Sequence, residues 1–291
     1  MELTPPPPVL TARGVRKHYG TVAALDGVDL EIHAGETVGL VGDNGAGKST
    51  LVKILSGVIQ PSAGEIFVDG KKVGLRSPRV AREQGIETIY QDLALALDLS
   101  VVANLFLGRE QILPGIAGRF GWLDNRRMMA TGRDKLDELN IRLPSIRSEC
   151  GSLSGGQRQA VAVARAVMWR RRMVLMDEPT AALGVQQQQQ VVDLIEQLHR
   201  QGVTVLVISH NLPQVCRICH RVVAERLVRT PGARLAWVAH APSHAIQTCS
   251  RGQNQGGAYA ELSRNRPAMR KSARRPTRPQ GWSGILGERP Y

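Results

Sequence analysis

A segment near the N-terminus has the composition and spacing of a phosphate-binding loop. It consists of Gly42, Asp43, Asn44, Gly45, Ala46, Gly47, Lys48, Ser49 and Thr50, and it fits G-x-x-x-x-G-K-[ST] at every fixed position. Its glycines lack a Cβ, so the backbone can curl and aim its N–H groups at phosphate oxygens. Lys48 is expected to reach the β- and γ-phosphates, and the Ser49 hydroxyl is expected to bind Mg²⁺. The segment therefore predicts a site for a nucleoside triphosphate.

The residues around this loop provide the context that such a site needs. The apolar run 36–41 (ETVGLV) predicts a buried strand, and residues 51–55 continue the loop as a helix. The helix beginning near Gly47 would add the positive end of its dipole. A glycine-rich turn that binds nothing is the alternative, and the two flanks argue against it.

Two carboxylates follow a second apolar strand, which is expected at residues 173–176. Asp177 would emerge at the carboxyl edge of the sheet, where open α/β folds bind ligands, and there it would hold Mg²⁺. Glu178 is one residue further along, placed to orient and deprotonate a water that attacks the γ-phosphate. The alternative is that both residues only cap the next helix.

A Leu-Ser-Gly-Gly-Gln segment at residues 153–157 lies shortly before this strand. With it, residues 9–224 resemble the ATP-binding subunit of an ABC transporter. The resemblance implies an α/β P-loop NTPase with a mostly parallel core sheet, a small antiparallel β-layer and a helical subdomain at about residues 93–160. It also implies hydrolysis of ATP, with Mg²⁺, coupled to transport across a membrane.

The same resemblance gives roles to three residues that end predicted strands. Tyr19 corresponds to the aromatic residue that stacks on adenine. Gln91 follows the strand predicted at 86–90 and corresponds to a glutamine that contacts Mg²⁺ and the attacking water and relays nucleotide state to the membrane partner. His210 follows the strand predicted at 204–209 and corresponds to a histidine that contacts the γ-phosphate. A structural role at a strand end is the alternative for each.

The Leu-Ser-Gly-Gly-Gln segment implies a second phosphate site. Ser154 would cap a long helix whose first N–H groups can bind an anion. In the family this segment binds the γ-phosphate of the ATP held by the opposite subunit, and the residues expected to do so are Ser154, Gly155, Gly156 and Gln157. One chain would then carry two half-sites, so dimerisation, with a homodimer expected, would be part of the mechanism.

Two stretches point to one branch of the family. After Glu-Pro-Thr many members have Ser-Ala-Leu-Asp, whereas this chain has Ala181, Ala182, Leu183 and Gly184. That form and residues 89–110 resemble the monosaccharide importers. The resemblance implies a sugar as cargo, a transmembrane permease, a separate solute-binding protein and a peripheral position at the cytoplasmic face of the inner membrane.

Composition sets further bounds. The chain has 291 residues and is 42% hydrophobic, which is ample for a core. It has no apolar run of 18 residues, and its first residues lead us to expect no secretory signal. Its four cysteines suggest no disulfide framework. Cys216 to His220 fits the C-x-x-C-H pattern of haem attachment, but that chemistry needs export, so no haem is expected. The glutamine run 186–190, inside a helix predicted at 185–200, is expected to be a solvated surface.

The two ends of the chain differ from the rest. Residues 1–8 are a proline-rich lead, and residues 225–291 hold twelve Lys and Arg against three Asp and Glu, which is nine of the net thirteen positive charges. No helical or strand period persists there, so the tail is predicted to be disordered. One alternative is a basic tail that binds nucleic acid or lipid. The other is a reading-frame shift near residue 224, which would leave a damaged, non-functional subunit. A soluble ABC ATPase acting on nucleic acid is a further alternative, although no nucleic-acid partner is expected.

Overall fold

The structure is a computed structural model that describes residues 8–42, 45, 47–169, 172–181, 183–225 and 241–242. Three predicted loop residues, Asp43, Asn44 and Ala46, lie outside the described residues. So do residues 1–7, Ala182 and nearly all of the basic tail, so the predictions made for them stay predictions.

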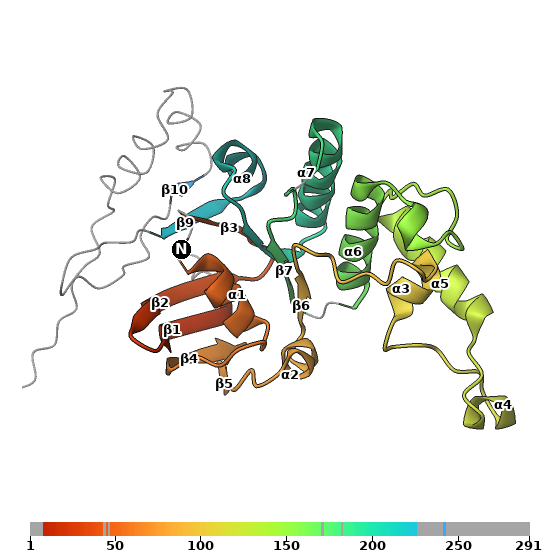
Figure 1. Ribbon diagram of the computed structural model, residues 1–291, viewed down its shortest axis with the longest axis horizontal. Helices are drawn as coiled ribbons and strands as arrows, with labels where there is room; N and C mark the ends of the chain where they lie inside the picture. The colour runs from red at the N-terminus through yellow and green to blue at the C-terminus, as the bar shows by residue number, and fades with distance from the viewer. Residues whose placement is uncertain are drawn as a thin grey trace, which may run out of the picture.

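A six-stranded sheet forms the centre of the fold (Figure 1). Its order is β10-β9-β3-β8-β7-β6, and its strands are β3 (Thr37–Gly42), β6 (Ile86–Ile89), β7 (Met173–Asp177), β8 (Thr204–Ile208), β9 (Arg221–Glu225) and β10 (Ala241–Pro242). All pairs are parallel except β9 with β10. Strands β3, β7 and β8 are almost wholly buried, as expected for a parallel sheet covered on both faces. Because the strands are parallel, β3, β7 and β8 end at the same edge.

A second, antiparallel sheet has the order β2-β1-β4-β5, from β1 (Pro8–Tyr19), β2 (Val22–His33), β4 (Ala63–Val68) and β5 (Lys71–Val73). Helix α1 (Lys48–Leu55) lies beside this sheet and next to the central one (Figure 1). Side chains of the two sheets and α1 share one apolar cluster, in which Leu10, Leu40 and Leu51 are fully buried. The antiparallel layer expected from the sequence is therefore confirmed.

A group of helices lies beside the β6 edge of the central sheet (Figure 1). Residues 78–169 contain α2 (Pro78–Glu83), α3 (Val101–Phe106), α4 (Ile116–Arg119), α5 (Asn125–Glu138), η1 (Cys150–Ser152) and α6 (Gly155–Trp169). Figure 1 shows α3, α4 and α5 on the far side of α6 from the sheet. The indole Nε1 of Trp169 donates to the Leu105 carbonyl at 2.7 Å, and its ring packs edge-on against Phe106. These contacts fix α3 to the end of α6.

Helix α7 (Val185–Arg200) has the bounds that the sequence predicts, and α8 (Leu212–Ile218) precedes β9. The apolar face of α7 is buried through Val191, Leu194, Ile195 and Leu198. The expectation that the glutamine run is a solvated surface is wrong in part. Gln187 and Gln188 are half-buried, because the first turn of α7 lies against other segments.

The basic tail meets the sheet at two points. Strand β9 pairs with β3 up to Glu225, one residue beyond the boundary predicted at 224. Ala241 and Pro242 then pair with Val222 and Arg221. The remaining tail residues lie outside the described part of the chain, so neither disorder nor a frame shift is tested.

Candidate nucleotide site

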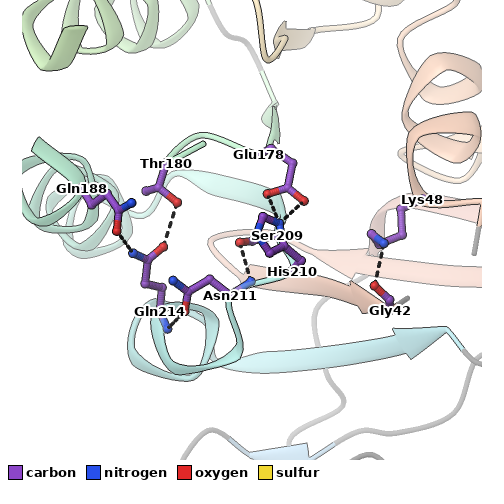
Figure 2. A network of polar contacts seen from close by, with 9 residues as sticks. All are labelled: Gly42, Lys48, Glu178, Thr180, Gln188, Ser209, His210, Asn211 and Gln214. Atoms are coloured by element: carbon purple, nitrogen blue, oxygen red, sulfur yellow. Dashed lines mark hydrogen bonds and ion pairs between the residues drawn. The ribbon is translucent and has the colours of Figure 1, made fainter. Parts of the chain in front are cut away.

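Lys48 is the first residue of α1. Its side chain is almost fully buried and reaches back to the last residue of β3. Its Nζ donates to the Gly42 carbonyl at 2.6 Å, and the residue is 7% exposed (Figure 2). Gly45 and Gly47 have φ values of 85° and 94°, which are accessible mainly to glycine. Ser49, in the first turn of α1, is exposed. The loop therefore has the strand–loop–helix setting that a phosphate site needs.

Asp177 ends β7 at the same edge of the sheet. Its Oδ1 is buried and has no hydrogen-bond partner among the described residues. Burial raises the pKa of this carboxyl, the neighbouring charge of Glu178 raises it further, and Lys53 and Lys48 oppose the change. A buried carboxylate oxygen without a donor is costly unless a cation or a proton satisfies it. The site fits a hard divalent cation.

Glu178 and His210 come together at the ends of β7 and β8. His210 Nδ1 lies 2.9 Å from both carboxylate oxygens of Glu178 (Figure 2). The Glu178 N–H donates to the Ile208 carbonyl at 2.9 Å, and Glu178 has a φ of 50°, which is rare for a non-glycine residue. The Glu178 side chain is 18% exposed and that of His210 is 67% exposed. The pair thus faces outward from a strained and well-anchored turn.

Tyr19 and Gln91 lie at the ends of other strands. Tyr19 ends β1 with 51% of its surface exposed, and its ring is 5.3 Å from the ammonium nitrogen of Lys17. Gln91 is exposed just after β6 and makes no hydrogen bond within the described residues. Neither side chain is joined to the Glu178–His210 pair, so the structure leaves both free to meet a ligand.

The Leu-Ser-Gly-Gly-Gln segment forms the start of α6. Ser154 Oγ accepts from the Gln157 N–H at 3.3 Å, and Gln157 Oε1 accepts from the Ser154 N–H at 3.0 Å. This reciprocal pair is a capping box, so Ser154 caps α6 as predicted. Gly155 is half-buried and Gly156 is buried beside α7, where a Cβ on Gly156 would lie 3.1 Å from Gln190 Oε1. In Figure 1 the strands β6 and β7 separate α6 from α1, so this segment and the loop before α1 lie apart in one chain.

The C-x-x-C-H pattern does not form a reactive site. Cys216 and Cys219 are buried and form no disulfide with a described residue, and burial raises the pKa of the Cys219 thiol strongly. His220 instead accepts from the Thr37 N–H at 3.1 Å and contacts His199. The described residues contain no group of three metal-ligating side chains of the His, Cys, Asp and Glu types.

Sequence reasoning missed three residues near the site. Thr180, Gln188 and Gln214 come from the turn after β7, from α7 and from α8, and hydrogen bonds join them (Figure 2). Gln188 could not be distinguished from its neighbours in the glutamine run. Gln214 likewise has no feature in the sequence that separates it from other glutamines in helices.

Comparison with known proteins decides the family. The ABC transporter family model matches residues 25–181. This chain belongs to the ABC transporter family. The fold class and the ABC-type ATPase subunit expected from the sequence are therefore confirmed.

Relatives of this ABC ATPase are named as sugar import proteins. It is 48% identical over 224 residues to the fructose import ATP-binding protein of Rhizobium meliloti, covering 76% of this chain and 86% of the relative. It is 50% identical over 214 residues to the xylose/arabinose import ATP-binding protein of Sulfolobus acidocaldarius, covering 74% and 83%. A ribose import ATP-binding protein of Rubrobacter xylanophilus is 43% identical over 225 residues, covering 77% of this chain and 44% of that longer relative. These relatives do not favour a damaged subunit or an ATPase acting on nucleic acid.

Solved structures agree on the fold. The ADP conformation of an ATP-binding cassette of an ABC transporter superposes with a TM-score of 0.69 at 24% identity, covering 87% of this chain and 98% of that one. The dimeric structure of a bacterial ABC transporter cassette gives a TM-score of 0.61 at 25% identity, covering 74% and 93%. Within the described residues, no helix of this ABC ATPase has the length and apolar character needed to span a bilayer.

Proposed function

We propose that this chain is the ATP-hydrolysing subunit of an importer for a monosaccharide. The observation that carries the proposal is the edge of the central sheet, where Lys48, Asp177 and the Glu178–His210 pair gather at the carboxyl ends of three neighbouring parallel strands, β3, β7 and β8. Relatives at 48% and 50% identity are named as import proteins for fructose and for xylose or arabinose, which supports a sugar as the cargo.

ATP binds at the loop and at the N-terminus of α1. Lys48 and the loop N–H groups of residues 42–50 hold the β- and γ-phosphates, and Tyr19 stacks on the adenine with its exposed ring. Ser154 to Gln157 of a second copy contact the γ-phosphate from the opposite side. This arrangement needs a dimer, as in the dimeric cassette that this fold resembles.

Asp177, Ser49 and Gln91 are the residues that would hold Mg²⁺. Asp177 Oδ1 is the buried oxygen that lacks a donor, while Ser49 and Gln91 are exposed polar residues at the loop and after β6. When bound, the cation neutralises the charge of the phosphate oxygens.

Glu178 accepts the proton of the attacking water, and His210 holds the Glu178 carboxylate in one orientation. In this pair the ionised carboxylate can only accept, so His210 Nδ1 is the donor. The rate gain comes from positioning and from charges that are already in place before the reaction.

The permease docks beside Gln91. A groove of about 610 Å³ lies between β6, α2, α6 and residues 107–109, and its lining includes Tyr90, Arg82 and Trp169. Tyr90 lines the groove and directly precedes Gln91, which contacts the nucleotide site. A change at the nucleotide would therefore be transmitted through these two residues to a segment of the permease bound in the groove. The subunit would then sit at the cytoplasmic face of the inner membrane and serve a permease that receives its sugar from a solute-binding protein.

Sugar uptake tests the proposal. Cells lacking this chain would be supplied with labelled fructose, xylose, arabinose or ribose, and complemented with the native chain or with Glu178→Gln. The native chain should restore uptake of at least one sugar and the variant should not. The proposed function would be contradicted if the native chain left the uptake of every sugar at the level of the cells that lack it, and if RNA co-purified with the chain.

A further inference from the structure

A closed set of hydrogen bonds ties the turn after Glu178 to two helices (Figure 2). The Thr180 hydroxyl donates to Gln214 Oε1 at 2.8 Å, and Gln214 Nε2 donates to Gln188 Oε1 at 2.8 Å. Gln188 Nε2 then donates to the Leu183 carbonyl at 2.9 Å, which returns the chain of bonds to the turn where it began. Both amides thus use one donor and one acceptor in a single consistent direction.

The same glutamine is tied to the segment that carries His210. The Gln214 N–H donates to Asn211 Oδ1 at 3.3 Å, and the Asn211 N–H donates to Ser209 Oγ at 3.1 Å. Ser209 and Asn211 flank His210 on either side. Gln214 is therefore bonded, through its side chain and its backbone, to both segments that meet in the Glu178–His210 pair.

Burial makes these bonds hard to replace with water. Thr180 is 7% exposed and Ser209 is 3% exposed, and Gln188 and Gln214 are half-buried. A buried hydroxyl or amide left without its partner is costly, so the set holds one arrangement. Glu178 needs such support because its φ of 50° is unfavourable for a side chain with a Cβ.

We propose that Gln214 is a positioning residue, which acts through Thr180 and Gln188 to hold Glu178 and His210 in the geometry for hydrolysis. This inference rests on the proposed function, in which Glu178 accepts the proton of the attacking water. The glutamine run, expected to be only solvated surface, then contributes one member, Gln188, to the support of the site.

The Gln214→Met variant tests the role directly, because it keeps the length of the side chain and removes both amide groups. Its kcat for Mg²⁺-dependent ATP hydrolysis should fall about tenfold, since a small misplacement of a reacting group is enough for such a loss. KM and equilibrium affinity for ATP should stay within about twofold, because the phosphate contacts are elsewhere. The matched control is Gln186→Met, which makes the same change at an exposed glutamine of the run 186–190 in α7 and should alter nothing.

Two further variants separate positioning from simple stability. Gln214→Glu keeps an acceptor for the Thr180 hydroxyl and should retain most of the turnover. Thr180→Val removes one hydroxyl and should lower kcat as Gln214→Met does, with little further loss when both are combined. In a Glu178→Gln background, Gln214→Met should have no further effect on the single-turnover rate, because the group to be positioned is already disabled.

An unchanged kcat in Gln214→Met would overturn the inference. If Glu178→Gln inactivates the protein in the same experiments, the proposed function remains supported. A parallel loss of ATP affinity would overturn it too, by indicating a general structural role. If Gln214→Met does not fold, Thr180→Val is the test of the inference. An unchanged kcat in Thr180→Val would contradict the proposal that Gln214 positions Glu178 through Thr180. Full turnover in Glu178→Gln would instead contradict the proposed function itself.

Discussion

His210 Nδ1 lies 2.9 Å from both carboxylate oxygens of Glu178, although 32 residues separate the two in the chain. The contact exists because β7 and β8 are adjacent parallel strands whose ends meet at one edge of the sheet. The His210 side chain is 67% exposed. The contact fixes the orientation of the Glu178 carboxylate, and the exposed His210 side chain is accessible to a ligand.

Removing the imidazole should slow hydrolysis more than it weakens binding. In His210→Ala the Glu178 carboxylate loses its only side-chain partner among the described residues, and we expect kcat to fall about 100-fold, as for other misplaced catalytic groups. Affinity for ATP should change little, because Lys48 and the loop hold the phosphates. Steady-state kinetics together with a fluorescent-nucleotide titration measure both quantities. Equal losses in kcat and affinity would argue that His210 serves only binding.

Asp177→Asn should stabilise the nucleotide-free protein and abolish Mg²⁺-dependent turnover. Burial raises the pKa of Asp177, so the ionised form destabilises the folded state above that pKa. The neutral amide should raise Tm by roughly 2–4 °C, the shift that about 1 kcal/mol produces in a domain of 150–250 residues. The gain should shrink in acid, where Asp177 itself is protonated. A lower Tm at neutral pH would indicate that the carboxylate has a stabilising partner.

Stability should fall as the pH drops below neutrality. Burial lowers the pKa of His199 from 6.5, and the charge of His220 adds to the effect, since their Nε2 atoms are 2.6 Å apart. Between pH 6.5 and the lower pKa of the folded state, His199 is protonated in the unfolded chain but not in the folded chain. The free energy of unfolding therefore rises with pH in that window. Urea unfolding from pH 5 to 8 measures the slope. His199→Gln should reduce it, and an unaltered slope in this variant would contradict the assignment.

Gly39 is needed where α8 approaches β3. A Cβ there would lie 2.3 Å from Val215 Cγ1 and 3.0 Å from Cys219 Sγ. We expect Gly39→Ala to lower the free energy of unfolding by about 1–3 kcal/mol, the usual range for overpacking. Gly74→Ala is the matched control, because its Cβ would be 3.6 Å from Arg76 Nε. Urea midpoints compare the two, and equal midpoints would show that α8 can shift without cost.

The sequence predicts what short motifs encode and misses what packing creates. The positions of Lys48, Asp177 and Glu178 were predictable because each follows closely on an apolar strand, and the bounds of α7 follow from its apolar period. The Gln188–Gln214 bond was not predictable, because it depends on how the first turns of α7 and α8 meet. The His199–His220 contact escaped for the same reason, since it joins the end of α7 to the residue before β9.

Turnover by Glu178→Gln tests the central claim most directly. The native chain should hydrolyse ATP only with Mg²⁺, whereas the variant should bind ATP, stop hydrolysing it and accumulate as an ATP-bound dimer. Lys48→Ala is the control that should lose ATP binding altogether. Gel filtration with ATP and a phosphate-release assay give both readouts on the same samples. A Glu178→Gln variant that hydrolyses ATP at the native rate would contradict the assignment of Glu178 as the residue that accepts the proton from water.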